Sequence, residues 1–299
     1  MGSNSKSRSS SKSIVSDCFD SKTMAVVSHK GYEVQKKLGA GAFGTVFKAV
    51  NRKTNQLAAV KVIALDKMSK NSREKFLPRE IETTINSRHP NLVQVFDIFR
   101  ANHRLYIFME FAGNGDLTGF IRKHNGLKIR LACGWFLQAS NGLAYLHGTL
   151  YTAHRDIKPD NILLSEKWVA KMSDFGFAKE SFDRSSRRVL LSSTFCGTLP
   201  FECPQILEHK PYDAFKGDIW SMGVTFFIMF HNKFPFNYRD GSKAMLKQHY
   251  DYPGHIRSKY ERKLPHDANR LCEDMLNPDE GKRCSVKELV SNSYIKNNS

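Results

Sequence analysis

The segment His154-Arg155-Asp156-Ile157-Lys158-Pro159-Asp160-Asn161 decides the interpretation of this sequence, and Asp174-Phe175-Gly176 follows eighteen residues after its first aspartate. This combination is typical of phosphoryl transfer, in which one carboxylate orients the attacking hydroxyl and accepts its proton. Asp156 has the position for that role, and Lys158 can neutralise charge on the transferred phosphoryl group. A chance match over this length and spacing is too rare to explain the pattern.

The same segments and a glycine-rich stretch supply groups for a metal ion and for phosphates. Asn161 and Asp174 carry hard oxygen atoms, which Mg²⁺ prefers. Upstream, Leu38-Gly39-Ala40-Gly41-Ala42-Phe43-Gly44-Thr45-Val46 contains a G-x-G-x-x-G pattern between two expected strands. A dinucleotide fold would continue into a helix here, whereas a glycine-rich hairpin lays backbone N–H groups over phosphates. Alone, the pattern also fits a tight hairpin with no ligand.

A lysine follows inside the apolar stretch Ala59-Val60-Lys61-Val62. A lysine is costly to bury without a partner, so we expect an acidic residue on a neighbouring helix. Glu80 and Glu82 are the candidates, and we favour Glu80, which lies nine residues before His89. The alternative is that Lys61 extends into solvent.

The apolar pattern changes from strand-like to helical along the chain. Strands are predicted at residues 32–38, 45–50, 57–63, 93–99 and 105–111, and a helix is predicted at residues 72–87. Further helices are predicted at residues 131–147, 218–230, 271–276 and 286–291. We therefore expect an α+β fold in which a small β-rich lobe precedes a larger α-helical lobe. Gly113 and Gly115 allow the chain to turn between them.

The net charge of +17, from 46 Lys and Arg against 29 Asp and Glu, is the unusual feature of the composition. Residues 1–31 are rich in Ser, Lys and Arg, and we expect a disordered tail because little apolar surface offsets the entropy of ordering. That tail holds five Lys or Arg and two Asp, a net of +3, which leaves +14 for the rest. The excess keeps nucleic acid, anionic membranes and acidic proteins open as partners.

Other features narrow these classes. The longest mostly apolar run, residues 220–230, is shorter than the roughly 20 residues of a membrane span, and no secretory signal is evident. The six cysteines show neither Cys-x-x-Cys pairs nor metal spacing with histidine, so we expect reduced thiols in an intracellular protein. No helix-turn-helix, zinc or aromatic-basic motif accompanies the charge, so no nucleic-acid partner is expected.

Taken in order, these motifs resemble the eukaryotic protein kinase family. The resemblance covers residues 32–294 and implies a bilobal protein kinase fold, with an N-lobe at 32–109, a hinge at 110–115, a C-lobe at 116–294 and a short tail at 295–299. It implies that ATP is the phosphoryl donor and Mg²⁺ the cofactor. It also implies that the catalytic and metal-binding residues are those named above.

The resemblance carries a nucleotide site onto this chain. Its small-lobe residues would be Leu38, Gly39, Ala40, Gly41, Ala42, Phe43, Gly44, Val46, Ala59, Lys61 and Glu80. Residues 105–110 look like the strand that enters the hinge, which places Met109 at the gatekeeper position. The backbone at Glu110 and Ala112 would bind adenine, and Asp116 would lie near the ribose or near a basic residue of the substrate.

Two further matches concern the larger lobe. Asp218-Ile219-Trp220-Ser221-Met222-Gly223 looks like the buried-helix signature whose aspartate braces the catalytic loop. Phe195-Cys196-Gly197-Thr198 looks like the substrate-facing loop, with Thr198 contacting Asp156.

The resemblance also indicates a subgroup. Lys158, two residues after the catalytic aspartate, is the serine/threonine type of residue. The chain is similar to the calcium/calmodulin-dependent kinase group. Within it, Phe76-Leu77-Pro78-Arg79-Glu80 and Ser193-Thr194-Phe195-Cys196-Gly197 resemble the testis-specific serine kinases. Asp116 and Asp160 lie where basophilic members bind an arginine before the target, so we expect protein substrates whose Ser or Thr is flanked by basic residues.

A phosphorylation site is predicted in the segment after Asp174. A phosphate on Thr194 would add about −2 charge and could pair with Arg155, Lys179 and Arg79. The two preceding serines are the alternative sites, and either an upstream kinase or the chain itself could phosphorylate the residue. We expect the protein in the cytoplasm, with the nucleus as the alternative.

Two residues depart from the family pattern. The family's Ala-Pro-Glu, whose glutamate pairs a buried arginine, is here Cys203-Pro204-Gln205, with Arg283 as the expected arginine. An arginine without its anion is destabilised by roughly 1–3 kcal/mol. Thr84 stands where the family places Leu or Met against the position of Phe175. A weakly active or pseudokinase-like scaffold is therefore the alternative to an active kinase.

Overall fold

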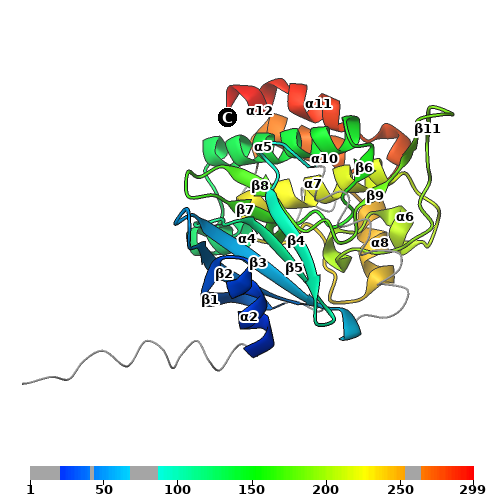
Figure 1. Ribbon diagram of the computed structural model, residues 1–299. Coiled ribbons are helices and arrows are strands. Elements are labelled where there is room, and N and C mark those ends of the chain that lie inside the picture. Colours follow the sequence, from blue (N-terminus) through cyan, green and yellow to red (C-terminus); the bar gives the residue numbers. More distant parts are fainter. Residues whose placement is uncertain (1–20, 41–43, 68–86, 253–263) are drawn as a thin grey trace, which may run out of the picture. The chain divides into compact units, whose positions relative to one another are not determined.

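The computed structural model describes residues 21–40, 44–67, 87–252 and 264–299 (Figure 1). The chain divides into two units that are discontinuous in sequence. The first comprises Met1–Glu74 and Gln94–Phe111, and the second comprises Lys75–Val93 and Ala112–Ser299. The predicted helix at residues 72–87 lies almost wholly outside the described residues.

A five-stranded antiparallel sheet forms the first unit, with the strand order β1-β2-β3-β5-β4. Its strands are β1 (Tyr32–Ala40), β2 (Gly44–Asn51), β3 (Leu57–Ala64), β4 (Val95–Ala101) and β5 (Arg104–Glu110), and a 3₁₀ turn, η1 (Leu65–Lys67), follows β3. Asn102 and His103 both have positive φ, 50° and 57°, which is the two-residue hairpin turn that matches strand twist. All five strands agree with the prediction to within two residues at each end.

One face of this sheet is buried beneath helix α2 (Ser21–His29) (Figure 1). The helix packs through Val27, which is fully buried together with Phe47, Val60 and Phe108 of the sheet. Residues 21–31 therefore differ from the disordered tail expected at residues 1–31, and residues 1–20 lie outside the described residues. Thr23 and Val27 lie one helical turn apart and turn the same face inward, so even a Ser- and Lys-rich segment has enough buried contact to order.

Polar contacts also attach the same helix to β4 and β5. Lys30, just after α2, forms an ion pair with Asp97 of β4 at 2.9 Å, and its ammonium lies 4.3 Å from the centre of the Phe99 ring. Arg104 of β5 donates a hydrogen bond to the Thr23 hydroxyl. These contacts make α2 part of the first unit.

The second unit is mainly helical. Its helices are α4 (Leu117–His124), α5 (Ile129–Gly148), α6 (Pro204–Leu207), α7 (Ala214–His231), α8 (Ser242–Tyr250), α10 (His266–Met275), α11 (Val286–Ser291) and α12 (Ser293–Asn297). Three 3₁₀ turns, η3 (Pro159–Asn161), η4 (Leu199–Phe201) and η5 (Glu280–Lys282), join them. Short strand pairs are β6 (Thr152–Ala153) with β9 (Lys179–Glu180), β7 (Ile162–Leu164) with β8 (Ala170–Met172), and β10 (Phe182–Asp183) with β11 (Arg188–Val189).

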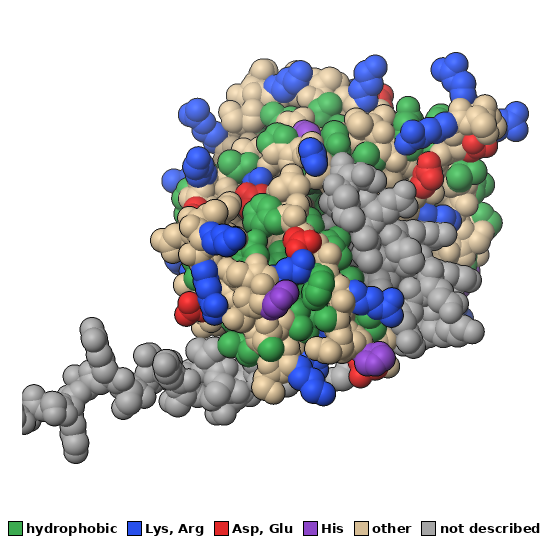
Figure 2. Space-filling view, in the orientation of Figure 1, with side chains coloured by type: hydrophobic (Ala, Val, Ile, Leu, Met, Phe, Trp, Pro, Cys, Tyr) green, Lys and Arg blue, Asp and Glu red, His purple; other side chains and the backbone are tan. Residues whose placement is uncertain are grey.

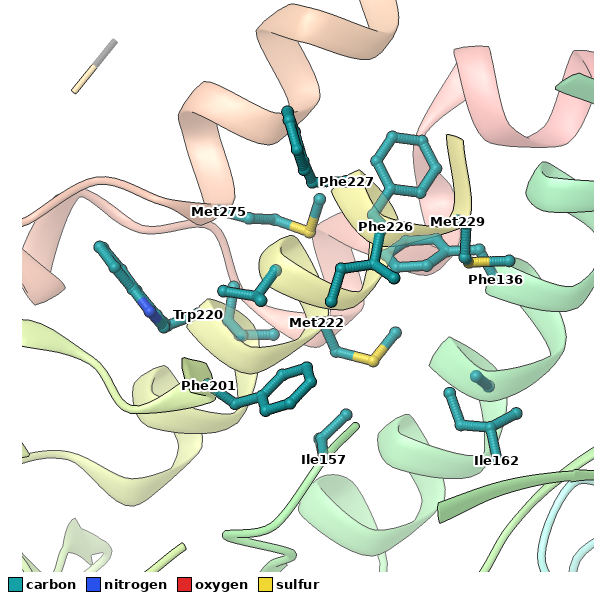
Figure 3. Close-up of a cluster of buried hydrophobic side chains, with 14 of the residues drawn as sticks. Phe136, Ile157, Ile162, Phe201, Trp220, Met222, Phe226, Phe227, Met229 and Met275 are labelled. Carbon is teal, nitrogen blue, oxygen red and sulfur yellow. The ribbon is translucent and has the colours of Figure 1, made fainter. Parts of the chain in front are cut away.

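Helix α7 is the centre of the second unit's core. Figure 3 shows Trp220, Phe226 and Phe227 of α7 surrounded by side chains from α5, α10 and the loops. Nearly every α7 side chain is buried, as predicted from its almost unbroken apolar sequence. The observed helix is longer than predicted, because Asp213 caps its N-terminus by accepting hydrogen bonds from Phe215 N and Lys216 N.

Residues 87–93 belong to the helical unit, not to the small lobe predicted at residues 32–109. The Asn91 side chain donates to Ala170 O at 3.1 Å, and Met172 N donates to Asn91 O at 2.8 Å. Leu92 is 1% exposed within the helical core. A Cβ on Gly142 of α5 would lie 2.7 Å from Asn91 O, so glycine allows this close approach. Tertiary packing that local sequence does not reveal therefore determines the assignment.

No helix among the described residues is long and apolar enough to cross a membrane. The five cysteines in the described ranges are free thiols. Lys and Arg side chains are spread over the visible face (Figure 2).

Candidate active site

A buried carboxylate holds the catalytic loop in place. Asp218, 1% exposed in α7, accepts hydrogen bonds from His154 N and Arg155 N, both at 2.7 Å. His147, in the last turn of α5, lies 2.8 Å from Asp218 through Nε2. Arg155 has φ of 66°, an unfavourable backbone conformation for a non-glycine residue, and the two backbone hydrogen bonds stabilise the turn. The predicted bracing role of Asp218 is thus visible in the geometry. The contribution of His147 was missed, because a histidine at a helix end carries no distinctive sequence signal.

Asp156 is the centre of the site. Its Oδ1 accepts from the Thr198 hydroxyl at 2.7 Å, and its Oδ2 accepts from Lys158 Nζ at 2.7 Å and Asn161 Nδ2 at 3.1 Å. Lys158 also donates to the Thr198 hydroxyl at 2.8 Å. Asp156 is 6% exposed, so these contacts hold an otherwise costly buried charge in one orientation. The predicted contact between Thr198 and Asp156 is confirmed.

The β7–β8 hairpin brings the two predicted metal ligands near one another. Ser173 donates to Asn161 O through both its backbone N, at 2.9 Å, and its hydroxyl, at 3.1 Å. Asp174 is the next residue, with φ of 63°. Asn161 uses Nδ2 to donate to Asp156, so Oδ1 is the atom of this amide that can bind a cation.

This pair fits Mg²⁺. Among the described residues, no cluster of three or more His, Cys, Asp and Glu side chains could hold a metal ion by itself. Mg²⁺ in phosphate-handling sites is usually bound by one or two protein groups together with phosphates and water. An amide oxygen from Asn161 and a carboxylate from Asp174 meet that requirement.

Phe175 is buried in the helical core at 3% exposure, with its ring centroid 5.5 Å from that of His154. The His154 Nδ1 accepts from Asp156 N at 3.3 Å, which leaves Nε2 to donate to Ser173 O at 3.1 Å. His154 therefore links the backbone of Asp156 to Ser173, the residue before Asp174.

The first unit places four of the side chains predicted to bind the nucleotide on one face of its sheet. Gly39, Val46 and Lys61 are paired across β1, β2 and β3. Ala59 of β3 is paired with Met109 of β5 in the same way. Because side chains alternate along a strand, Val46, Ala59, Lys61 and Met109 share the face opposite the one buried under α2. Leu38 and Ala40 continue β1, and Leu38 is 41% exposed.

Gly44 has a structural reason to be glycine. A Cβ at this position would lie 2.4 Å from Val62 O, because β2 and β3 approach closely here. At Gly39, by contrast, a Cβ would meet no atom within 4 Å. The third glycine of the motif is therefore needed by the sheet itself. Gly41, Ala42 and Phe43 lie outside the described residues, and so do Arg79, Glu80, Glu82 and Thr84.

The boundary between the two units falls inside the predicted hinge, between Phe111 and Ala112. Glu110 belongs to the sheet, where its backbone N donates to Gln94 O at 2.8 Å. Gly115 has φ of 76°, so the expected turn requires glycine. Asp116 caps α4 by accepting from Gly119 N at 2.7 Å.

A guanidinium in the catalytic loop faces the predicted phosphorylation segment. Arg155 donates through Nε to Phe177 O at 2.7 Å and through Nη1 to the Ser192 hydroxyl at 3.3 Å. Its Nη2 is buried and has no hydrogen-bond acceptor among the described residues. Thr194 is exposed, and its N donates to the Ser192 hydroxyl. Ser192 itself is fully buried and pairs with Tyr212 through the backbone.

Carbonyl groups surround Arg283, at the place where the family pattern would supply the carboxylate of a glutamate. Arg283, 2% exposed, donates through Nη2 to Gln205 Oε1 at 2.6 Å, as the sequence predicted. It also donates to the backbone oxygens of Asn277, Lys216 and Pro278 at 2.6, 3.2 and 3.2 Å. Its guanidinium lies 5.0 Å from the centre of the Trp220 ring. Burial lowers the pKa of Arg283 from its ordinary value.

Comparison with known proteins agrees with this geometry. The sequence model of the protein kinase domain matches residues 32–295. Testis-specific serine/threonine-protein kinase 2 of Mus musculus is 35% identical over 275 residues, 91% of this chain and 75% of that protein. Testis-specific serine/threonine-protein kinase 4 of Homo sapiens is 32% identical over 277 residues, 89% of this chain and 82% of that protein.

Plant relatives match the same region. CBL-interacting serine/threonine-protein kinase 12 of Arabidopsis thaliana is 36% identical over 266 residues, which cover 89% of this chain and 52% of that protein. The expected resemblance to the testis-specific serine kinases is confirmed, as is the bilobal α+β fold. This chain belongs to the protein kinase family.

Proposed function

We propose that this chain is an ATP- and Mg²⁺-dependent serine/threonine protein kinase, which transfers the γ-phosphoryl group to hydroxyls of protein substrates. The observation that carries the proposal is the convergence of Lys158, Thr198 and Asn161 on the carboxylate of Asp156. A buried carboxylate oriented by three donors is suited to accept a hydrogen bond from an attacking hydroxyl.

In the reaction, Asp156 orients the substrate hydroxyl and accepts its proton as the new P–O bond forms, while the bond from the γ-phosphorus to the bridging oxygen breaks and ADP leaves. Lys158, which already contacts Asp156 and Thr198, stabilises the negative charge on the transferred group. Thr198 holds Oδ1 of Asp156 so that the carboxylate does not rotate away from the hydroxyl. Asp218 acts indirectly, by holding the backbone of the loop.

Asn161 and Asp174 would hold Mg²⁺, which when bound neutralises charge on the nucleotide phosphates. The glycine-rich hairpin and Lys61 would bind those phosphates. The hinge backbone at Glu110 and Ala112 would bind the adenine. Support for these roles comes from the shared sheet face in the first unit and from the hairpin in the second unit.

The test is phosphate incorporation into a serine peptide with Mg-ATP. Asp156→Asn is expected to lower the rate by roughly 10²–10⁴-fold, the contribution of a positioned base. Asp267→Asn, at an exposed aspartate on α10, is the matched control and should retain the wild-type rate. Equal rates for wild type and Asp156→Asn would support the pseudokinase-like scaffold instead.

We also propose Thr194 as the regulatory phosphorylation site, because it is exposed while Ser192 is buried; Ser193 is exposed too and is the alternative site. A phosphate there would supply an acceptor for Arg155, whose Nη2 has none among the described residues. Mass spectrometry after incubation with Mg-ATP should find phosphate on Thr194 in the wild type if the chain modifies itself. If only an upstream kinase modifies it, purified wild type and Asp156→Asn should both remain unmodified.

Substrate preference is proposed from the two acidic residues named in the sequence analysis. Asp116 and Asp160 would bind arginine before the target residue, so peptides with an arginine three positions before the target should be preferred. A peptide array in which removal of that arginine has no effect would contradict this preference. A cytoplasmic or nuclear location is proposed from the free thiols.

A further inference from the structure

An apolar groove of about 380 Å³ lies in the helical unit, away from the catalytic residues. Its lining residues are Phe120, Lys123 and His124 of α4, Leu131 and Trp135 of α5, and Trp168 of the β7–β8 turn. Trp168 is 48% exposed and Leu131 is 38% exposed. Large apolar side chains gathered at one exposed place are typical of an interaction site, whereas isolated ones are ordinary.

The groove is built from rings that hold one another in place. Phe120 packs edge-on against Trp135 and Trp168, with centroid distances of 4.9 and 5.5 Å. Trp135 donates its indole N–H to Trp168 O at 2.9 Å. His124 stacks on Phe120 at 4.1 Å, and its Nδ1 lies 2.8 Å from Phe120 O. Such walls need little reordering when a partner binds, which favours affinity.

The groove's surroundings are positively charged. Lys123 and His124 lie on its lining, and both are exposed in the last turn of α4. The flanking segments 120–131 and 166–168 contain five Lys or Arg but only one acidic residue, Glu166. An anionic partner is therefore favoured over a cationic one.

The start of α5 adds to this preference. Leu131, a lining residue, is in the first turn of this 20-residue helix. That turn has no acidic residue, and Lys128 at the N-cap forms no side-chain cap hydrogen bond. The free backbone N–H groups of a helix N-terminus attract negative charge.

We propose that this groove docks a segment of a partner protein in which large apolar residues are flanked by Asp or Glu. The apolar side chains would bind between Phe120, Trp135 and Trp168, and the acidic residues would face Lys123 and the start of α5. A small-molecule site would normally add several convergent polar groups to its walls, and the groove's lining offers few. The inference does not rest on the proposed kinase activity, because none of these residues belongs to the catalytic machinery.

The experiment is selection from a random twelve-residue peptide display library on the full chain. Enriched peptides are expected to combine Leu, Ile, Phe or Trp with neighbouring Asp or Glu. A fluorescein-labelled enriched peptide should then bind about tenfold more weakly to Trp168→Asn and to Lys123→Glu, since one anchor often dominates an interface. Asn suits position 168, where φ is 60°, so the first variant keeps the turn.

Lys247→Glu is the matched control, because Lys247 is likewise an exposed lysine in the last turn of a helix, α8. Its peptide affinity should match the wild type. Enrichment without acidic residues, or binding unaffected by Trp168→Asn, would overturn the proposal. The proposal would also be overturned if no peptide were enriched and the chain instead bound single-stranded DNA, with that binding lost in Trp168→Asn. That result would identify a base-stacking site.

Discussion

Gln205 is expected to stabilise the helical unit almost as well as the glutamate that the family pattern places there. Its Oε1 accepts from Arg283 at 2.6 Å, and its Nε2 donates to Pro278 O at 2.7 Å. Two substitutions separate these contributions. Gln205→Ala removes both hydrogen bonds, and Gln205→Glu keeps the acceptor, adds a charge and removes the donor.

The magnitudes follow from these two contacts. A hydrogen bond to a charged group contributes about 1.5–3 kcal/mol and a neutral one about 1 kcal/mol. Because Arg283 Nη2 keeps its contact with Pro278 O at 3.2 Å, Gln205→Ala should lower the free energy of unfolding by about 2–3 kcal/mol. For Gln205→Glu, the stronger charge-assisted bond is offset by the lost bond to Pro278, so stability should stay within about 1 kcal/mol of the wild type.

The assay is urea unfolding followed by tryptophan fluorescence. All three tryptophans lie in the helical unit, and Trp220 lies beside Arg283. Gln138→Ala is the control, because the Gln138 side chain accepts one hydrogen bond from a neutral group, Ala170 N at 2.7 Å. It should cost about 1 kcal/mol.

Two results would refute this reasoning. If Gln205→Ala were no more harmful than Gln138→Ala, the bond to Arg283 would contribute nothing beyond a neutral contact. If Gln205→Glu were more stable than the wild type by about 3 kcal/mol, the carbonyl groups around Arg283 would not replace an anion.

Two other predictions concern pH and close packing. Burial lowers the pKa of His249 from 6.5 to about 3. Between these pH values the unfolded state therefore binds a proton that the folded state does not. The free energy of unfolding should fall by about 2 kcal/mol from pH 7 to pH 5. The measurement is urea unfolding at both pH values. His249→Gln should weaken the pH dependence, whereas His266→Gln, at a side chain that is 89% exposed, should leave it intact. If the two variants had the same pH dependence, the prediction would be wrong. Gly44→Ala should destabilise the first unit by about 1–3 kcal/mol, because its Cβ would overlap Val62 O. Gly39→Ala should lower the stability less in thermal unfolding, and a larger loss at Gly39 would contradict the prediction.

The convergence of Asp156, Lys158 and Asn161 could be predicted from the sequence because these three residues are close together along the chain. The spacing of Asp156, Lys158 and Asn161 within one loop determines that they meet, and the structure brings them together. The strands could also be predicted, because alternation of apolar residues and two-residue turns are local signals.

Features that depend on packing between distant segments could not be predicted. Helix α2 is ordered partly by contacts with β5, about 80 residues further along the chain, and residues 87–93 join the helical unit through contacts with α5 and β8. The carbonyl groups around Arg283 were equally hidden, since backbone atoms carry no sequence signal. The cost expected at Arg283 from the sequence alone therefore did not take these carbonyl acceptors into account.

The position of residues 87–93 has a consequence for how the chain can be divided. The helical unit uses a piece of chain that is synthesised before the last two strands of the sheet, so the two units are interleaved in the gene. A fragment that begins at Ala112 would lose the hydrogen bonds that Asn91 and Val93 form with β8. It would also expose the surface of α5 at Gly142, against which Asn91 packs. Exchange of the sheet between related kinases therefore needs three junctions, one before residue 87, one after Val93 and one at the hinge, rather than a single cut.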